Sequence, residues 1–175
     1  MTSSVHFSSK SAEHYTPPKI IRLCLDFWQC EQIDLDPCSN SKTEPNFPAY
    51  QVFTQEDDGL QQSWDAKTLF MNPPYGREIE FWVRKLVEEY ELGYVKEAIT
   101  LVPGRIDTGW FHLMTGYTAC FVRGRLKFTG PGNPAGNPAP FPSVLFYLGP
   151  DNYRFSQHFS SLGSIWREWP CETEF

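Results

Sequence analysis

The loop Asn72-Pro73-Pro74-Tyr75 holds the residues of this sequence that are best suited to chemistry. The side-chain oxygen of Asn72 and the backbone carbonyl of Pro73 can accept hydrogen bonds from the two protons of a planar amine. Each proline fixes its own φ and keeps the residue before it out of the helical region, so the carbonyl points in a fixed direction. Tyr75 offers a flat ring on which a base can stack, a contact worth roughly 1–3 kcal/mol. These residues predict a rigid loop that holds an exocyclic amine such as that of adenine. The alternative is a rigid turn with a capping Asn72 and a packed Tyr75.

An amine held in this way needs little further catalysis if it attacks an activated methyl group. Orientation alone can contribute up to roughly 7–11 kcal/mol, so no strong general base is required. A base inside a duplex would first have to be flipped out of the stack.

Charged residues gather in two segments of opposite sign within a chain of net charge −6. Residues 26–65 contain nine acids and one base, whereas residues 101–150 contain one acid and four bases, which are Arg105, Arg123, Arg125 and Lys127. This pattern is compatible with a small cationic ligand near the first segment and a polyanion near the second. Uneven but solvated surfaces would produce the same pattern.

Regular elements on both sides must position the loop. The apolar run 68–71 predicts a buried strand, and apolar residues at helical spacing predict a helix over about 77–91. The loop therefore follows the carboxyl end of a strand, where open α/β sheets bind their ligands. Alternating strands and helices favour an α/β fold with a mostly parallel sheet and helices on both faces. The same patterns predict helices over 18–28 (which Thr16 can cap) and 108–114, strands over 33–36, 51–53, 98–102, 118–122 and 143–148, and loops over 37–50 and 129–142.

The length of 175 residues suits one domain. We expect a flexible segment over 1–14, a catalytic domain over 15–150, and a C-terminal extension over 151–175 that packs on the same domain. No apolar run is long enough for a membrane span, and the polar start lacks the core of a secretion signal. The five cysteines lack zinc-site spacing and the four histidines are scattered. We therefore expect a cytoplasmic protein with reduced thiols and no metal site.

Several short motifs follow one another along residues 15–148: Tyr15-Thr16-Pro17-Pro18, Leu35-Asp36-Pro37 with Asn40, Glu56-Asp57-Asp58-Gly59-Leu60 with Trp64, Asn72-Pro73-Pro74-Tyr75-Gly76, Leu101-Val102-Pro103-Gly104-Arg105, Gly124-Arg125-Leu126-Lys127-Phe128 and Pro140-Phe141-Pro142-Ser143. In this order they resemble the phage-type DNA N-6-adenine-methyltransferase (Dam) family. The resemblance implies a single-domain, Rossmann-like methyltransferase fold with S-adenosylmethionine as the cofactor. It also implies methyl transfer to N6 of an adenine flipped out of double-stranded DNA. A phage or prophage origin in a bacterial host is implied as well, with methylation that shields DNA from host nucleases.

The resemblance further implies a role for each matching position. The catalytic motif would be Asn72, Pro73, Pro74 and Tyr75. The cofactor would contact Tyr15, Thr16, Pro17, Asp36, Pro37 and either Asp57 or Asp58. Phosphates of DNA would contact Arg105, Arg123, Arg125 and Lys127, although each of these bases could equally be solvated. One departure is that residues 36–41 contain no glycine, where many such enzymes bring the backbone close to the cofactor.

Two alternatives remain open at the level of the sequence. The first keeps the fold and cofactor but takes RNA or a protein glutamine as the acceptor. The second is a catalytically inactive relative that binds nucleic acid. Neither the target sequence nor the oligomeric state follows from the residues.

Overall fold

A seven-stranded sheet forms the centre of the computed structural model, which describes residues 14–130 and 133–167. The segment 1–13 and the last part of the expected C-terminal extension, 168–175, lie outside the described residues. The strand order is β2-β1-β3-β4-β6-β5-β7. The strands are β1 (Ile33–Asp36), β2 (Ala49–Val52), β3 (Ala66–Met71), β4 (Val95–Pro103), β5 (Thr118–Val122), β6 (Ser143–Leu148) and β7 (Gly163–Trp166).

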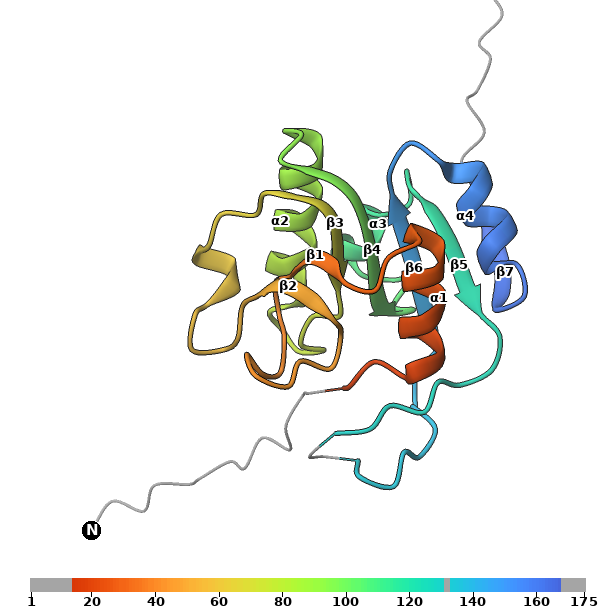
Figure 1. The fold of residues 1–175 in the computed structure, drawn as a ribbon. Coiled ribbons are helices and arrows are strands. Elements are labelled where there is room, and N and C mark those ends of the chain that lie inside the picture. Colours follow the sequence, from red (N-terminus) through yellow and green to blue (C-terminus); the bar gives the residue numbers. More distant parts are fainter. Residues whose placement is uncertain (1–13, 131–132, 168–175) are drawn as a thin grey trace, which may run out of the picture.

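Five of these strands run in the same direction. The pairs β1–β2, β1–β3 and β3–β4 are parallel, whereas β6 lies antiparallel between β4 and β5, and β7 is antiparallel to β5. Because β6 opposes both neighbours, β5 runs with β4. The carboxyl ends of β1, β3, β4 and β5 therefore meet at one edge of the sheet, the lower edge in Figure 1. All loops that follow these strands are gathered at that edge.

Helices cover both faces of the sheet. They are α1 (Pro18–Trp28), α2 (Ile79–Glu91), α3 (Gly109–His112) and α4 (Asn152–Phe159), with a short 3-10 helix over Gly59–Gln61. Successive residues of β6 point to opposite faces, so Tyr147 packs against Phe27 of α1 and Phe155 of α4, while Phe146 packs against Phe111 of α3. Figure 1 shows α1 in front of the sheet and α2 and α3 behind it. The predicted α/β fold class with a mostly parallel sheet is confirmed.

Several elements differ in detail from the sequence prediction. Strand β2 begins two residues earlier than expected, and β4 is longer at both ends. The expected cap at Thr16 is wrong, because Pro17 is the N-cap of α1 and makes no side-chain bond to the helix. The pattern after residue 150 did not predict α4 or β7, which pack on β5.

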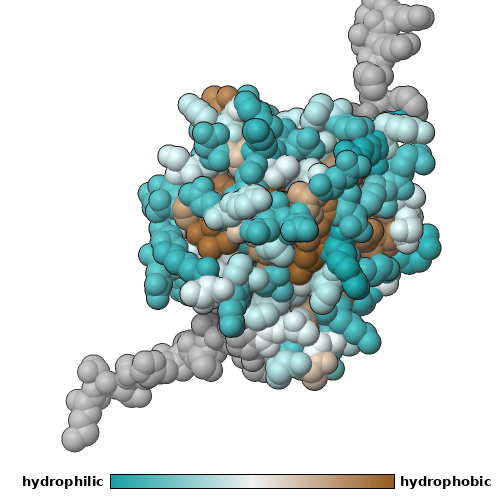
Figure 2. Space-filling model, in the orientation of Figure 1, coloured by the Kyte–Doolittle hydropathy of each residue, from teal (hydrophilic) through white to brown (hydrophobic). Residues whose placement is uncertain are grey.

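On the face seen in Figure 2, most apolar surface lies in the middle of the molecule among hydrophilic residues, and a further apolar group lies at the top edge. Within residues 14–130 and 133–167, no helix combines the length and apolar character that crossing a membrane requires.

Candidate active site

A cavity of about 610 Å³ opens at the carboxyl edge of the sheet. Parts of four segments line it: 14–16, 36–47, 54–60 and 70–82. Its volume lies within the range of roughly 300–1,000 Å³ that is usual for small-molecule sites. The lining residues include three acids, Asp36, Asp58 and Glu78. They include no lysine or arginine. The charge of this wall suits a cationic ligand.

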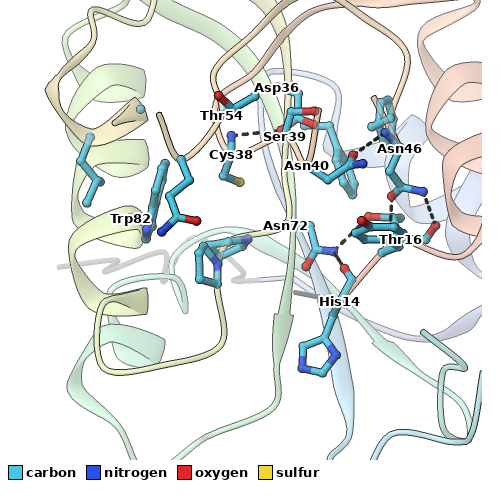
Figure 3. A pocket seen from close by; sticks show the side chains of 18 of the residues that line it. His14, Thr16, Asp36, Cys38, Ser39, Asn40, Asn46, Thr54, Asn72 and Trp82 are labelled. Atoms are coloured by element: carbon cyan, nitrogen blue, oxygen red, sulfur yellow. Dashed lines mark hydrogen bonds between the residues drawn. The ribbon is translucent and has the colours of Figure 1, made fainter. Parts of the chain in front are cut away.

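Asn72 lies on the cavity wall directly after β3 (Figure 3). Its Nδ2 donates to the carbonyl oxygen of His14 at 2.6 Å and to Oγ1 of Thr16 at 3.0 Å. The His14 carbonyl can only accept, which fixes the orientation of the Asn72 amide. Its Oδ1 is buried and has no hydrogen-bond partner among the described residues. A buried acceptor without a partner costs roughly 1–3 kcal/mol, so a donor from outside the chain would be stabilised here.

Tyr75 is held rigidly behind the loop. Its hydroxyl donates to the carbonyl oxygen of Leu101 in β4 at 3.1 Å, and only 8% of the residue is exposed. The ring packs against His14, Phe128 and Phe141, with centroid distances of 4.9, 5.9 and 5.4 Å. Tyr75 is therefore not part of the cavity wall, whereas Pro73 and Pro74 are.

Asp36 is the last residue of β1 and is 6% exposed on the cavity wall. Its Oδ1 accepts from the backbone N–H of Cys38 at 3.1 Å, and its backbone carbonyl accepts from Phe53. Burial raises the pKa of Asp36 to about 7, although hydrogen bonds from Cys38 and Ser39 oppose the shift. No Lys or Arg in the described parts of the chain forms an ion pair with it. A buried carboxylate without a cation is a site where a positive ligand would be favoured.

Asp57 and Asp58 point to different surroundings. Asp57 forms an ion pair with Lys42 at 2.6 Å and accepts from the backbone and hydroxyl of Thr54. Hydrogen bonds from Lys42 and Thr54 lower the pKa of Asp57 to about 2. Asp58 adopts a left-handed φ of 51° and lines the cavity. Of these two acids, Asp57 stabilises its own turn and Asp58 faces the cavity.

The turn that carries Asp58 packs directly on the loop after β1. A Cβ at Gly59 would lie 2.0 Å from the carbonyl oxygen of Pro37, so this contact requires glycine. The indole of Trp64 donates to the Gly59 carbonyl at 2.9 Å and is itself in the core. Pro37 thus supports the cavity without being part of its wall.

Residues just before α1 form part of the cavity wall. Tyr15 and Thr16 line it, while Pro17 does not. The backbone N–H of Thr16 donates to Oδ1 of Asn46 at 2.7 Å, and that of Tyr15 donates to the Thr129 carbonyl at 2.9 Å. The Thr16 hydroxyl contacts Asn72 rather than the helix terminus, which explains why it does not act as a cap.

The basic residues follow strands that end at this same edge. These residues are Arg105, Arg123, Arg125 and Lys127. All four are exposed, and none of them forms an ion pair within the described chain. Arg77, directly after the Asn72–Gly76 loop, is exposed and unpaired in the same way, and the sequence analysis missed it. The sheet topology thus places five cations on the edge that carries the cavity.

Several other cavity residues were also missed. His14 lies one residue before the motif that begins at Tyr15, and Trp82 belongs to the apolar side of α2, so neither was expected in the cavity. The indole Nε1 of Trp82 is buried without a partner among the described residues. Among those same residues, no cluster of three His, Cys, Asp or Glu side chains could hold a metal ion.

Comparisons with known proteins agree with this geometry. The sequence model of the DNA N-6-adenine-methyltransferase (Dam) family matches residues 6–165, which is most of the chain. A comparison with curated proteins found no match. With the family model spanning the sheet, the cavity and the loop at Asn72, this chain belongs to the DNA N-6-adenine-methyltransferase (Dam) family.

Proposed function

We propose that this protein transfers a methyl group from S-adenosylmethionine to the exocyclic N6 of an adenine that has left the DNA duplex. Membership of the family supports methylation of adenine in DNA. The cavity at the carboxyl edge of the sheet supports the choice of cofactor and of the residues that would hold it and the adenine.

The observation that carries the proposal is the buried, unpartnered Oδ1 of Asn72. The Asn72 amide uses its two protons on His14 and Thr16, so its oxygen is left to accept a hydrogen bond. An adenine N6 amine carries two protons, so it donates hydrogen bonds and needs two acceptors. One proton would meet Asn72 Oδ1 and the other the carbonyl of Pro73. Two acceptors of this kind favour a nitrogen whose lone pair is available for attack.

The cavity fits the cofactor on three counts. Its volume is suitable, its wall carries three acids without a lysine or arginine, and Asp36 is buried without a cation. S-adenosylmethionine supplies an electrophilic methyl group on a positively charged sulfur. Asp36 would attract that charge, and Thr16 and Tyr15 would close over the bound molecule. Asp58 would accept hydrogen bonds from its ribose or adenine.

The transfer itself needs few groups from the protein. The N6 lone pair would form the new N–C bond as the C–S bond breaks, the electron pair of that bond would stay on sulfur, and N6 would then release one proton to solvent. Asn72 and Pro73 hold N6 in line for this displacement, which is a contribution of orientation. Exposed cations at the same edge would hold the phosphates and orient the duplex without reading its sequence.

The direct test is the polymer that takes up labelled methyl groups from the cofactor. The full chain is incubated with long duplex DNA of mixed sequence, with RNA, or with a protein extract. We expect label only in DNA, as N6-methyladenine after digestion to nucleosides. Label confined to RNA or protein would instead support the alternative acceptors. Absence of both transfer and cofactor binding would support an inactive nucleic-acid-binding relative.

The two neighbouring acids give a matched pair of variants. We expect Asp58→Asn to weaken cofactor binding roughly tenfold, because a charged hydrogen bond contributes about 1.5–3 kcal/mol and Asp58 is solvent-exposed. Asp57→Asn should leave the affinity near that of the wild type and lower the melting temperature, because it loses the Lys42 ion pair. Calorimetric titration with S-adenosylmethionine and thermal melts measure both effects. The reverse order of affinities would assign the cofactor contact to Asp57.

A further inference from the structure

Three residues before α1, His14, Tyr15 and Thr16, form a strap that is fixed at both sides of the cavity. Tyr15 bonds the backbone of Thr129 in the long loop after β5, at 2.9 Å. Thr16 exchanges hydrogen bonds with the Asn46 side chain in the loop after β1, at 2.7 and 3.4 Å. The strap therefore lies between the two loops and across the end of β3.

The strap contacts both residues that a target adenine would need, Asn72 and Tyr75. Figure 3 shows Asn72 between His14 and Thr16, with hydrogen bonds to each. Its Oδ1 is inaccessible as well as unpartnered. The His14 ring lies against the Tyr75 ring with a centroid distance of 4.9 Å and an angle of 37° between the planes. One short segment thus binds the amide of Asn72 through Nδ2 and packs its imidazole against the Tyr75 ring.

The His14 imidazole is held in an aromatic cage. Phe128 and Phe141 contact it at centroid distances of 5.3 and 5.6 Å, and both also contact Tyr75 edge-on. Burial lowers the pKa of His14, so the ring is a neutral planar heterocycle. A purine stacked on Tyr75 would require a centroid distance in the same range of about 4.5–7 Å. A nucleobase on the side of the Tyr75 ring that His14 covers would overlap with the imidazole.

We infer that the His14 imidazole occupies the target-base position on Tyr75 in the DNA-free protein and that an incoming adenine must displace it. This inference deepens the proposed function and rests on it. His14 is then a selectivity residue that competes with the base, because only a base able to stack on Tyr75 and bond Asn72 recovers what the displaced ring loses. The backbone carbonyl of His14 can keep its hydrogen bond to Asn72 Nδ2 while the ring moves away, so the amide stays oriented for the base.

The test is a pair of substitutions with opposite expected effects. His14→Ala removes the competing ring and keeps the backbone carbonyl that bonds Asn72. It should lower the KM for DNA roughly tenfold, since each lost ring contact weakens the competitor. His14→Phe keeps a larger apolar ring in the cage and should raise the KM for DNA. His112→Ala, an exposed histidine on α3, is the matched control and should match the wild type.

A second measurement follows the ring without any methyl transfer. The imidazole proton signals of His14 are assigned by their absence in His14→Ala. An adenine-containing single-stranded oligonucleotide, whose bases need no unpairing, should shift them toward the values of an exposed histidine, whereas an all-thymine oligonucleotide should not. If the wild type methylates no DNA, the proposed function fails. If it does methylate DNA but His14→Ala leaves the KM for DNA unchanged or raises it, or the signals do not move, the displacement is wrong.

Discussion

Replacing Asn72 with alanine is expected to reduce methyl transfer by at least about 100-fold, the loss seen when one preorganised hydrogen-bonding group is removed from an active site. The side chain provides a buried acceptor at the end of β3 that has no hydrogen-bond partner among the described residues. The affinity for S-adenosylmethionine should change little, because the residue proposed to attract the positive charge of the cofactor is Asp36 and not Asn72. The measurement is single-turnover transfer of labelled methyl groups to DNA.

The fold should survive this substitution. Two hydrogen bonds from Nδ2 are lost, each worth about 0.5–1.5 kcal/mol, while a buried acceptor that costs a similar amount disappears. We therefore expect a melting temperature within a few degrees of the wild type. Gln157→Ala, which removes an exposed amide on α4, is the control for loss of an amide elsewhere. Full activity in Asn72→Ala would refute the proposed role of the loop.

Replacing Asp36 with asparagine is expected to weaken binding of S-adenosylmethionine about 100-fold and to abolish its pH dependence. In the wild type, the cationic ligand favours the ionised carboxylate, whose pKa in the free protein is about 7. Affinity should therefore rise by up to about tenfold per pH unit below 7 and level off above pH 8. Asparagine has no such titration. Calorimetric titration with S-adenosylmethionine measures the affinity of the wild type and of Asp36→Asn as a function of pH. The range from about pH 5.5 to 8.5 extends about 1.5 units to each side of this pKa.

The same substitution should stabilise the unliganded protein at high pH. The folded-state pKa of Asp36 lies above the ordinary aspartate value of 3.8, so between about pH 4 and 7 the folded chain binds a proton that the unfolded chain has released. Stability in the wild type therefore falls as pH rises through this window. At pH 8, Asp36→Asn should gain at most about 4 kcal/mol, and below about pH 4 the difference should vanish. Asp26→Asn, on the exposed face of α1, is the control, and equal pH profiles for Asp36→Asn and the wild type would argue against a buried, ionising Asp36.

Local patterns predicted the elements that position the loop. The apolar run before Asn72 and the helical spacing after it gave β3 and α2 nearly as the structure has them. Strand β7 was not predicted because it is an edge strand of four residues, of which only Gly163 is buried. Helix α4 was not predicted either. Phe155 and Phe159 lie four residues apart, but most of the other residues of that segment are polar.

For the candidate site too, some features could be predicted from the sequence and others depended on the tertiary structure. Sequence alone determined which residues carry suitable chemistry. The amide of Asn72, the two prolines after it and the carboxylate of Asp36 are properties of the residue types, and their places at strand ends follow from local patterns. Tertiary structure decided which of Asp57 and Asp58 faces the cavity, because adjacent residues in a turn differ only in what surrounds them. It also decided that the Tyr75 ring is covered, since His14 lies 58 positions before Asn72 and reaches the loop only through the folded chain. Burial and long-range contact depend on the whole fold, so no local pattern in the sequence could reveal them.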